Sequence, residues 1–268
     1  MIGIQGCPPK TLIYQFSFDR YCHAIRTRSS PVITLADEAY RAIREEILKG
    51  QLRPGTPLSR RRLARTLGMS VVPVTDALRR LEEAGLVEVR ARAGTRVRVP
   101  TETDVRELYE LREALETQSA RLFAQRATPA QRIDLRRLAA RVDALFARLA
   151  TRGDDDAFRF AVHSQHVQLH LRIAERAGSQ LLRQMIDRSH VLILNWLFDV
   201  AGRRTALPPR FHAGLVDALV SGDPDEAEAA MRAHVHYGLA EITGRISALA
   251  ATEWRERDRV RARRTLKI

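Results

Sequence analysis

Apolar residues recur at steps of three and four over most of this chain, a pattern typical of amphipathic α-helices. The first clear run carries Ala39, Ile43 and Ile47, and Thr34 precedes it as a candidate N-cap. No hydrophobic period is visible over residues 1–30, which we interpret as a disordered or over-extended N-terminus. The pattern therefore predicts a mainly α-helical protein whose order begins near residue 31.

Two shorter helices are expected after a turn at residues 52–55. Ser59 is placed to cap the first, which Gly68 ends, because glycine readily adopts the left-handed conformation of a helix C-terminus. Ser70 is placed to cap the next, with Pro73 tolerated in its first turn and Gly85 at its end. Two such helices joined by a tight turn are typical of a helix-turn-helix.

A β-hairpin is expected directly after these helices. Residues 86–89 and 96–99 alternate between apolar and polar, and Ala93-Gly94 lies between them. Three helices followed by a hairpin give the order of a winged helix-turn-helix, which we assign to residues 31–100.

Beyond Pro100 the helical period continues, which predicts an all-α antiparallel helical bundle over residues 101–250. In the last helix Asp223 is a candidate cap, Pro224 the first position and Glu226 part of a capping-box-like pattern. Residues 251–268 form a basic tail, interpreted as a solvated extension, with assistance to DNA binding as the alternative. The expected helices lie near residues 103–126, 129–150, 156–177, 180–200, 209–221 and 224–250.

The charge balance adds a candidate partner. The chain has 45 Lys and Arg against 32 Asp and Glu, a formal net charge of +13. Such an excess favours a polyanion such as nucleic acid, although a GC-rich genome also encodes many arginines.

Cys7 and Cys22 are too few for a disulfide framework or a thiolate metal cluster. Since neither a signal peptide nor a membrane-length apolar run is visible, we expect a cytoplasmic protein without a membrane partner.

The third helix of a winged helix-turn-helix enters the major groove of double-stranded DNA, and the wing contacts the backbone or the minor groove. An ordinary set of surface charges, or a protein-interaction module, is the alternative interpretation of this part of the chain. The candidate DNA-binding residues near the helix edge are Arg61, Arg62, Ser70, Val71, Val72, Thr75, Arg79 and Arg80, and those in the wing are Gly94, Thr95 and Arg96.

The stretch LRPGTPLSRRRLARTLGMSVVPVTDALRRLEEAGLVEVRARAGTRV resembles the DNA-binding core of the GntR family of bacterial regulators. The match runs from about Leu35 to Val99, and the helical remainder is similar to the FadR-like C-terminal domain. Because one helix-turn-helix reads only a half-site, we expect a homodimer that binds a palindromic operator. The resemblance implies a repressor more readily than an activator. The residues themselves leave the sign of regulation open.

The recognition helix departs from the family pattern. Where the family usually has Ser-Arg-Thr-Pro-Val-Arg-Glu-Ala-Leu, this chain has Ser-Val-Val-Pro-Val-Thr-Asp-Ala-Leu, so Val71 and Thr75 replace two arginines that commonly read guanine. We therefore expect an operator unlike the usual guanine-containing half-site. Weakened DNA binding is the alternative.

A group of histidines forms a second candidate functional site, in the helical part of the chain. His166 and His170 are four residues apart on one expected helix, and His212 and His234 lie on two later helices. Neutral imidazoles that converge from three helices suit a divalent metal, with zinc or nickel favoured. The resemblance implies the same ligand set, with His166 at the position of a family aspartate. If His166 points away, three histidines remain; the other interpretation is ordinary core or surface histidines.

In FadR-like domains the metal commonly lies beneath a small carboxylate effector, and Arg112 matches an arginine that helps to hold it. The alternative for Arg112 is an ion pair with Glu116 one turn later, since Leu108 and Tyr109 one turn earlier are expected to offer no partner. His163, His190 and His236 are expected to be solvated or to support the ligands.

The sequence is compatible with three functions, and the favoured hypothesis is a ligand-responsive regulator. A regulator whose effector is the metal itself would use the same residues. A metal-dependent hydrolase is disfavoured, because the chain shows no His-Glu-x-x-His, no glycine-rich phosphate loop and no Gly-x-Ser-x-Gly elbow. We therefore expect no enzymatic activity.

Overall fold

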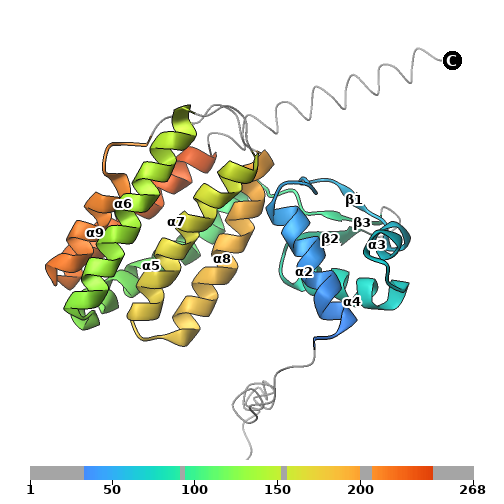
Figure 1. Cartoon of the computed structure of the whole chain (residues 1–268), viewed down its shortest axis with the longest axis horizontal. Coiled ribbons are helices and arrows are strands. Elements are labelled where there is room, and N and C mark those ends of the chain that lie inside the picture. Colours follow the sequence, from blue (N-terminus) through green and yellow to red (C-terminus); the bar gives the residue numbers. More distant parts are fainter. Residues whose placement is uncertain (1–32, 91–93, 152–155, 200–206, 244–268) are drawn as a thin grey trace, which may run out of the picture. The chain divides into compact units, whose positions relative to one another are not determined.

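The computed structural model describes residues 33–90, 94–151, 156–199 and 207–243 (Figure 1). The predictions for residues 1–30 and 251–268 lie outside this range. The N-terminal part consists of α2 (Leu35–Leu48), α3 (Arg60–Leu67) and α4 (Val71–Glu83) with a small antiparallel sheet. The expected winged helix-turn-helix fold is confirmed.

The sheet has one more strand than the sequence predicts. Its order is β1 (Pro57–Leu58), β3 (Gly94–Val97) and β2 (Val87–Arg90), all antiparallel. The two-residue β1 is too short to show an alternating pattern, so it was missed. The prediction that the second hairpin strand spans residues 96–99 was two residues late, because pairing begins where Gly94, at φ 85°, lies opposite Arg90.

Local signals define the helix-turn-helix itself. The Ser59 hydroxyl accepts a hydrogen bond from the Arg62 amide at 3.3 Å and so caps α3. Gly68 ends α3 in the left-handed conformation at φ 65°, as predicted. Ser70 occupies the N-cap position of α4, but its side chain makes no capping hydrogen bond. The apolar faces of the three helices and the sheet enclose one core, made of Ala39, Ile43, Ile47, Leu58, Leu63, Ala64, Val74, Ala77, Leu78, Leu81, Leu86, Val87 and Val97.

The C-terminal part consists of helices joined by short connections in its described residues. It comprises α5 (Glu102–Arg126), α6 (Pro129–Thr151), α7 (Asp156–Arg176), α8 (Gln180–Asp199), α9 (Phe211–Ser221) and a last helix over residues 224–243. These bounds confirm the expected helices to within about two residues, except that residues 244–250 of the last one lie outside the described range. None of the described helices is both long and apolar enough to cross a membrane.

Capping fixes two of these helix starts. Thr101 and Asp104 form a reciprocal capping box at α5, with hydrogen bonds of 3.1 and 2.8 Å. At the last helix the Asp223 carboxylate accepts from the amides of Asp225 and Glu226, at 2.8 and 3.3 Å. The predicted role of Asp223 as a cap is confirmed.

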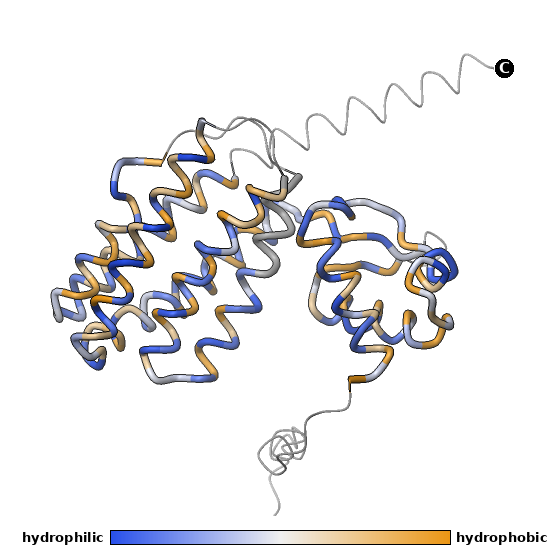
Figure 2. Tube along the Cα trace, in the orientation of Figure 1, coloured by the Kyte–Doolittle hydropathy of each residue, from blue (hydrophilic) through white to orange (hydrophobic). Residues whose placement is uncertain are grey.

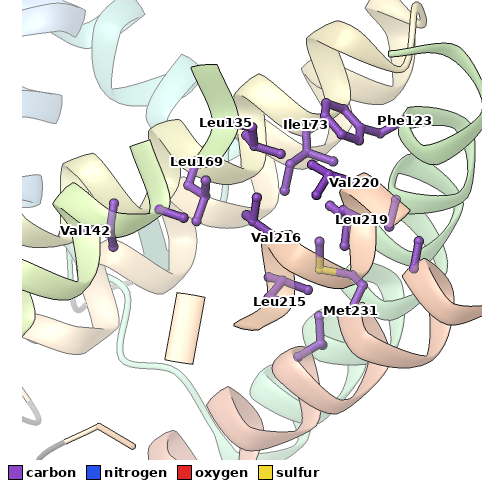
Figure 3. Packing of buried hydrophobic residues seen from close by; sticks show 14 of the residues in the cluster. Phe123, Leu135, Val142, Leu169, Ile173, Leu215, Val216, Leu219, Val220 and Met231 are labelled. Atoms are coloured by element: carbon purple, nitrogen blue, oxygen red, sulfur yellow. The ribbon is translucent and has the colours of Figure 1, made fainter. Parts of the chain in front are cut away.

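The bundle buries the apolar stripes of its helices against one another. Polar and apolar residues alternate along each helix in Figure 2, and α5 packs on α7, α8 and α9, while α6 packs on α7 and α9. Figure 3 shows the interior of this core, where Phe123, Leu135, Leu169, Ile173, Val216, Leu219 and Met231 converge. This packing brings α7, α9 and the last helix together around the histidines.

Candidate functional site

Three of the four predicted ligand histidines converge in the bundle. Nε2 of His170 lies 2.9 Å from Nε2 of His166 and 3.2 Å from Nε2 of His234, and the remaining pair is also 3.2 Å apart. His170 and His234 are buried, and His166 is partly exposed. His166 therefore points into the cluster rather than away from it.

These separations suit a divalent cation. Two nitrogens bound at about 2.1 Å are about 3.0 Å apart at right angles and about 3.4 Å apart in a tetrahedron. The three observed nitrogen separations, 2.9, 3.2 and 3.2 Å, lie between or close to these values. A single N–H proton can bridge only one pair in such a triangle. A cation would satisfy all three lone pairs.

The protonation states agree with this use. Burial lowers the pKa of His166 well below its ordinary value, and the neighbouring imidazoles lower it further. The pKa of His234 is lowered in the same way, again chiefly by burial. Both rings are therefore neutral near pH 7, the form that binds a metal.

A buried carboxylate orients His170. Oε2 of Glu116 lies 2.6 Å from Nδ1 of His170, and both side chains are about 1% exposed or less. Burial opposes ionisation of Glu116, but Arg112, His170 and His190 together hold its pKa well below the usual range. An ionised Glu116 favours the proton on Nδ1, which leaves the Nε2 lone pair directed into the cluster.

His212, the fourth predicted ligand, lies beside the other three. Its ring centroid is 4.8 Å from that of His166 and 5.4 Å from that of His234. The closely spaced nitrogens belong to His166, His170 and His234, and His212 is not part of that group. The structure therefore places His212 next to the cluster.

Asp143 on α6 holds His212 in place. Its Oδ1 is 2.7 Å from Nδ1 of His212 and accepts the His212 amide at 3.0 Å, and its Oδ2 accepts the Ala213 amide at 2.9 Å. Burial opposes ionisation of Asp143, but these hydrogen bonds from His212 and Ala213 lower its pKa overall. The carboxylate thus caps α9 from a neighbouring helix and also orients a histidine.

Arg112 lies in a closed ionic pair rather than in an open pocket. Its Nε donates to Glu116 at 2.6 Å, its Nη2 lies 3.4 Å from the same carboxylate, and the side chain is 5% exposed. The ion pair with Glu116, which was the alternative to effector contact, is present. The expectation that Tyr109 offers no partner was wrong, because the guanidinium lies over the Tyr109 ring, 4.8 Å from its centroid.

The remaining histidines take two different places. His163 and His190 are buried, and Nε2 of His190 is 3.1 Å from Oε1 of Glu116. Burial, with Arg112 nearby, lowers the pKa of His190 to about 3. His236 is exposed and pairs with Glu113 at 2.7 Å. His190 therefore supports the cluster through Glu116, whereas His236 belongs to the surface.

Sequence reasoning missed Asp143 and the link from Glu116 to His170. A signal existed for each, because both are acidic residues on apolar stripes. Asp143 lies between Ala139 and Phe146 on α6, and Glu116 lies between Tyr109 and Ala120 on the buried face of α5. Phe146 was also missed; its ring stacks on His212 with centroids 5.2 Å apart and gives the cluster an apolar wall.

The candidate DNA-binding residues lie largely on the surface of α3 and α4. Arg61, Arg62 and Ser70 are exposed, and Val71 and Val72 are 42% and 77% exposed. Two further candidates already have partners. The Thr75 hydroxyl donates to the Val71 carbonyl at 2.9 Å, and Arg79 pairs with Asp76 at 2.8 Å and with Glu83.

The candidate wing residues differ in accessibility. Gly94 is exposed, whereas Thr95 is buried at 8% exposure. Arg96 lies opposite Glu88 in the sheet register and donates its Nε to that carboxylate. Of the three, Gly94 is exposed and Arg96 is partly exposed, but the Arg96 side chain is already paired with Glu88.

A helix-turn-helix with a wing, joined to a helical bundle with a buried histidine cluster, defines the class of DNA-binding transcription regulators. Residues 35–97 match the family described as bacterial regulatory proteins, gntR family, and residues 107–237 match the FCD domain, the FadR-like C-terminal domain. The chain belongs to the GntR family. Since the family and its relatives are DNA-binding transcriptional regulators, the expectation that this chain is not an enzyme is confirmed.

Curated relatives cover most of the chain. A probable D-xylose utilization operon transcriptional repressor of Paenarthrobacter nicotinovorans is 33% identical over 209 residues, 75% of this chain and 86% of that protein. The HTH-type transcriptional regulator LutR of Bacillus subtilis is 28% identical over 215 residues, 70% of this chain and 92% of that protein.

Solved structures share the fold. E. coli McbR/YncC superposes with a TM-score of 0.63 at 21% identity, over 79% of this chain and 98% of that one. A putative transcriptional regulator GntR from Rhodococcus sp. RHA1 gives a TM-score of 0.64 at 22% identity, over 78% of this chain and 97% of that one.

Proposed function

We propose that this regulator is a repressor that binds a palindromic operator as a homodimer and responds to a small carboxylate at a metal site in the helical bundle. The observation that carries the proposal is the triangle of imidazole nitrogens from His166, His170 and His234, with sides of 2.9, 3.2 and 3.2 Å. One helix-turn-helix reads one half-site, so a two-fold dimer is the natural form on DNA.

His166, His170 and His234 would hold the metal, and His212 lies close enough to support or complete the set. An all-imidazole set favours zinc or nickel over harder cations such as magnesium. A bound divalent ion would act as a Lewis acid toward a carboxylate oxygen of the effector. Glu116 and Asp143 keep two of these rings in a fixed orientation.

Arg112 is the proposed contact for the effector carboxylate. Glu116 engages its Nε and Nη2, and the Nη1 donors are not used by that carboxylate. Glu116 contacts both Arg112 and His170. A ligand that binds the guanidinium would therefore change the pairing of Glu116 and, through it, the orientation of His170. This shared carboxylate gives a physical link between effector and metal.

The test uses the full chain and an operator selected from randomised duplex DNA. Operator affinity is measured by fluorescence anisotropy on metal-free protein, after one equivalent of zinc, and after zinc with acetate, malonate, succinate or citrate. Weakening of DNA binding by a carboxylate in the presence of zinc, and its absence in H170A/H234A, supports the proposal. No response to any carboxylate, with zinc alone changing the affinity, would favour a second function.

That second function is a metal sensor whose effector is the ion itself. The observation that favours it is the enclosure of the cluster, where His170 and His234 are buried, Phe146 packs against His166 and Phe211 packs against His234. Under this alternative, operator affinity follows the zinc or nickel concentration and ignores carboxylates.

A further inference from the structure

We infer that the recognition helix α4 reads thymine methyl groups through Val71 and Val72, so that the operator half-site is defined by A·T pairs rather than by guanine. This inference rests on the DNA-binding function proposed above. It adds the residues that set base specificity and the chemistry that they recognise.

The two valines are exposed apolar residues in the first turn of α4. Val72 is 77% exposed and Val71 is 42% exposed, whereas Val74, two residues on, is fully buried in the core. Neither exposed side chain belongs to the hydrophobic cluster that stabilises this part of the chain. Their adjacent apolar surface is therefore available at the helix end that meets base edges in a helix-turn-helix.

Positive charge is concentrated on the preceding helix. Arg60, Arg61, Arg62 and Arg65 of α3 are all exposed, and α3 contains no acidic residue. Within the described residues none of the four has a carboxylate partner. Free arginines on the first helix suit the DNA phosphates, which position the protein without selecting a sequence.

The arginines of α4 itself are occupied. Arg79 is held by Asp76 and Glu83, and Arg80 by Asp37 at 2.9 Å and by the ring of Tyr40. A bidentate contact to guanine would have to displace these carboxylates. The Thr75 hydroxyl is likewise used within the helix, since it donates to the Val71 carbonyl.

Only thymine offers an apolar group in the major groove, its C5 methyl. The two exposed valines match that group and offer no donor to guanine O6 or N7, and the arginines on the same helix are already paired. Burying one methyl against a valine is worth about a four-fold change in affinity, so two or more contacts per half-site give measurable selectivity.

The experiment selects duplexes from a randomised library with the full-length protein and then replaces each enriched thymine by deoxyuridine, which removes only the C5 methyl. We expect A·T-rich half-sites and a loss of about two- to four-fold at each contacted thymine. In V72A and V71A the ratio of the affinity for the thymine duplex to the affinity for the deoxyuridine duplex falls toward one. V89A is the matched control, because Val89 is 45% exposed on β2 and should keep the full difference.

Four results would overturn the inference. Guanine-defined half-sites, or a selected site that binds equally with deoxyuridine, would reject methyl recognition while leaving DNA binding intact. No enrichment of any duplex, with no binding at low salt, would reject the DNA-binding function and the inference together. Sequence-selective binding by V71A/V72A equal to that of the unaltered chain would assign the exposed valines to another partner, such as a protein.

Discussion

Nδ1 of His170 lies 2.6 Å from Oε2 of Glu116, and both side chains are buried. The same carboxylate accepts a hydrogen bond from Arg112 and lies 3.1 Å from His190. One side chain on α5 therefore fixes the ring that faces the other histidines and also neutralises a buried guanidinium. A carboxylate that orients a metal-binding imidazole contributes to affinity without touching the metal.

Replacing Glu116 by glutamine tests this orienting role. Since the amide lacks the charge that favours the Nδ1 proton of His170, we expect affinity for zinc to fall by about 10- to 100-fold. Competition with a chromophoric chelator measures the change. E110Q, on an exposed position of the same helix, serves as the control. Equal affinities for E116Q and the unaltered chain would show that the carboxylate does not act on the site.

Replacing Arg112 by alanine tests the buried ion pair. The substitution removes the guanidinium that balances the buried Glu116 carboxylate, and we expect the free energy of unfolding of the bundle to fall by about 3–5 kcal/mol. Urea unfolding of the metal-free chain, followed by circular dichroism, gives the value. R106A is the matched control, because Arg106 is exposed and pairs with Glu102 at 3.2 Å on the surface. A loss no larger than that of R106A would contradict the role assigned to the pair.

Replacing Asp143 by alanine removes both the tertiary cap of α9 and the partner of His212. We expect a loss of about 1–2 kcal/mol in stability, since two α9 amides and one imidazole lose their acceptor. Thermal unfolding measures it. D134A, an exposed aspartate on the same helix, should leave the midpoint within error. Indistinguishable midpoints for the two variants would remove the capping role.

The exposed arginines of α3 lead to a prediction about how DNA affinity depends on salt concentration. If Arg61 and Arg62 contact phosphates, R61A/R62A makes the dependence of log affinity on log salt shallower by about two. The loss should be similar on all DNA sequences, because phosphate contacts carry no base information. R137A/R141A removes two exposed arginines from α6 and is the control. Unchanged slopes in R61A/R62A would place the DNA-binding surface elsewhere.

Helix bounds and caps could be predicted from the sequence because their causes are local. Ser59, Gly68 and Asp223 act on neighbouring amides and carbonyls, and each stands where the pattern placed it. The strand β1 could not be predicted, since its two residues are fixed only by pairing with β3.

The histidines could be chosen from their spacing, but not their partners. Whether His166 faces inward depends on how α7 is rotated in the bundle, which no local pattern specifies. The link from Glu116 to His170 joins α5 to α7, and the link from Asp143 to His212 joins α6 to α9. The sequence also could not predict whether Arg79 is paired within the protein, because Asp76 and Glu83 compete with DNA for the same guanidinium.

The most direct test of the metal site is elemental analysis of the full-length protein, purified without a tag and without added metal. We expect about one zinc or nickel per chain, reduced to background in H170A/H234A and retained in H236A, because His236 lies on the surface beside Glu113. A chain that holds no metal, even after incubation with zinc or nickel and removal of the excess, would contradict the account.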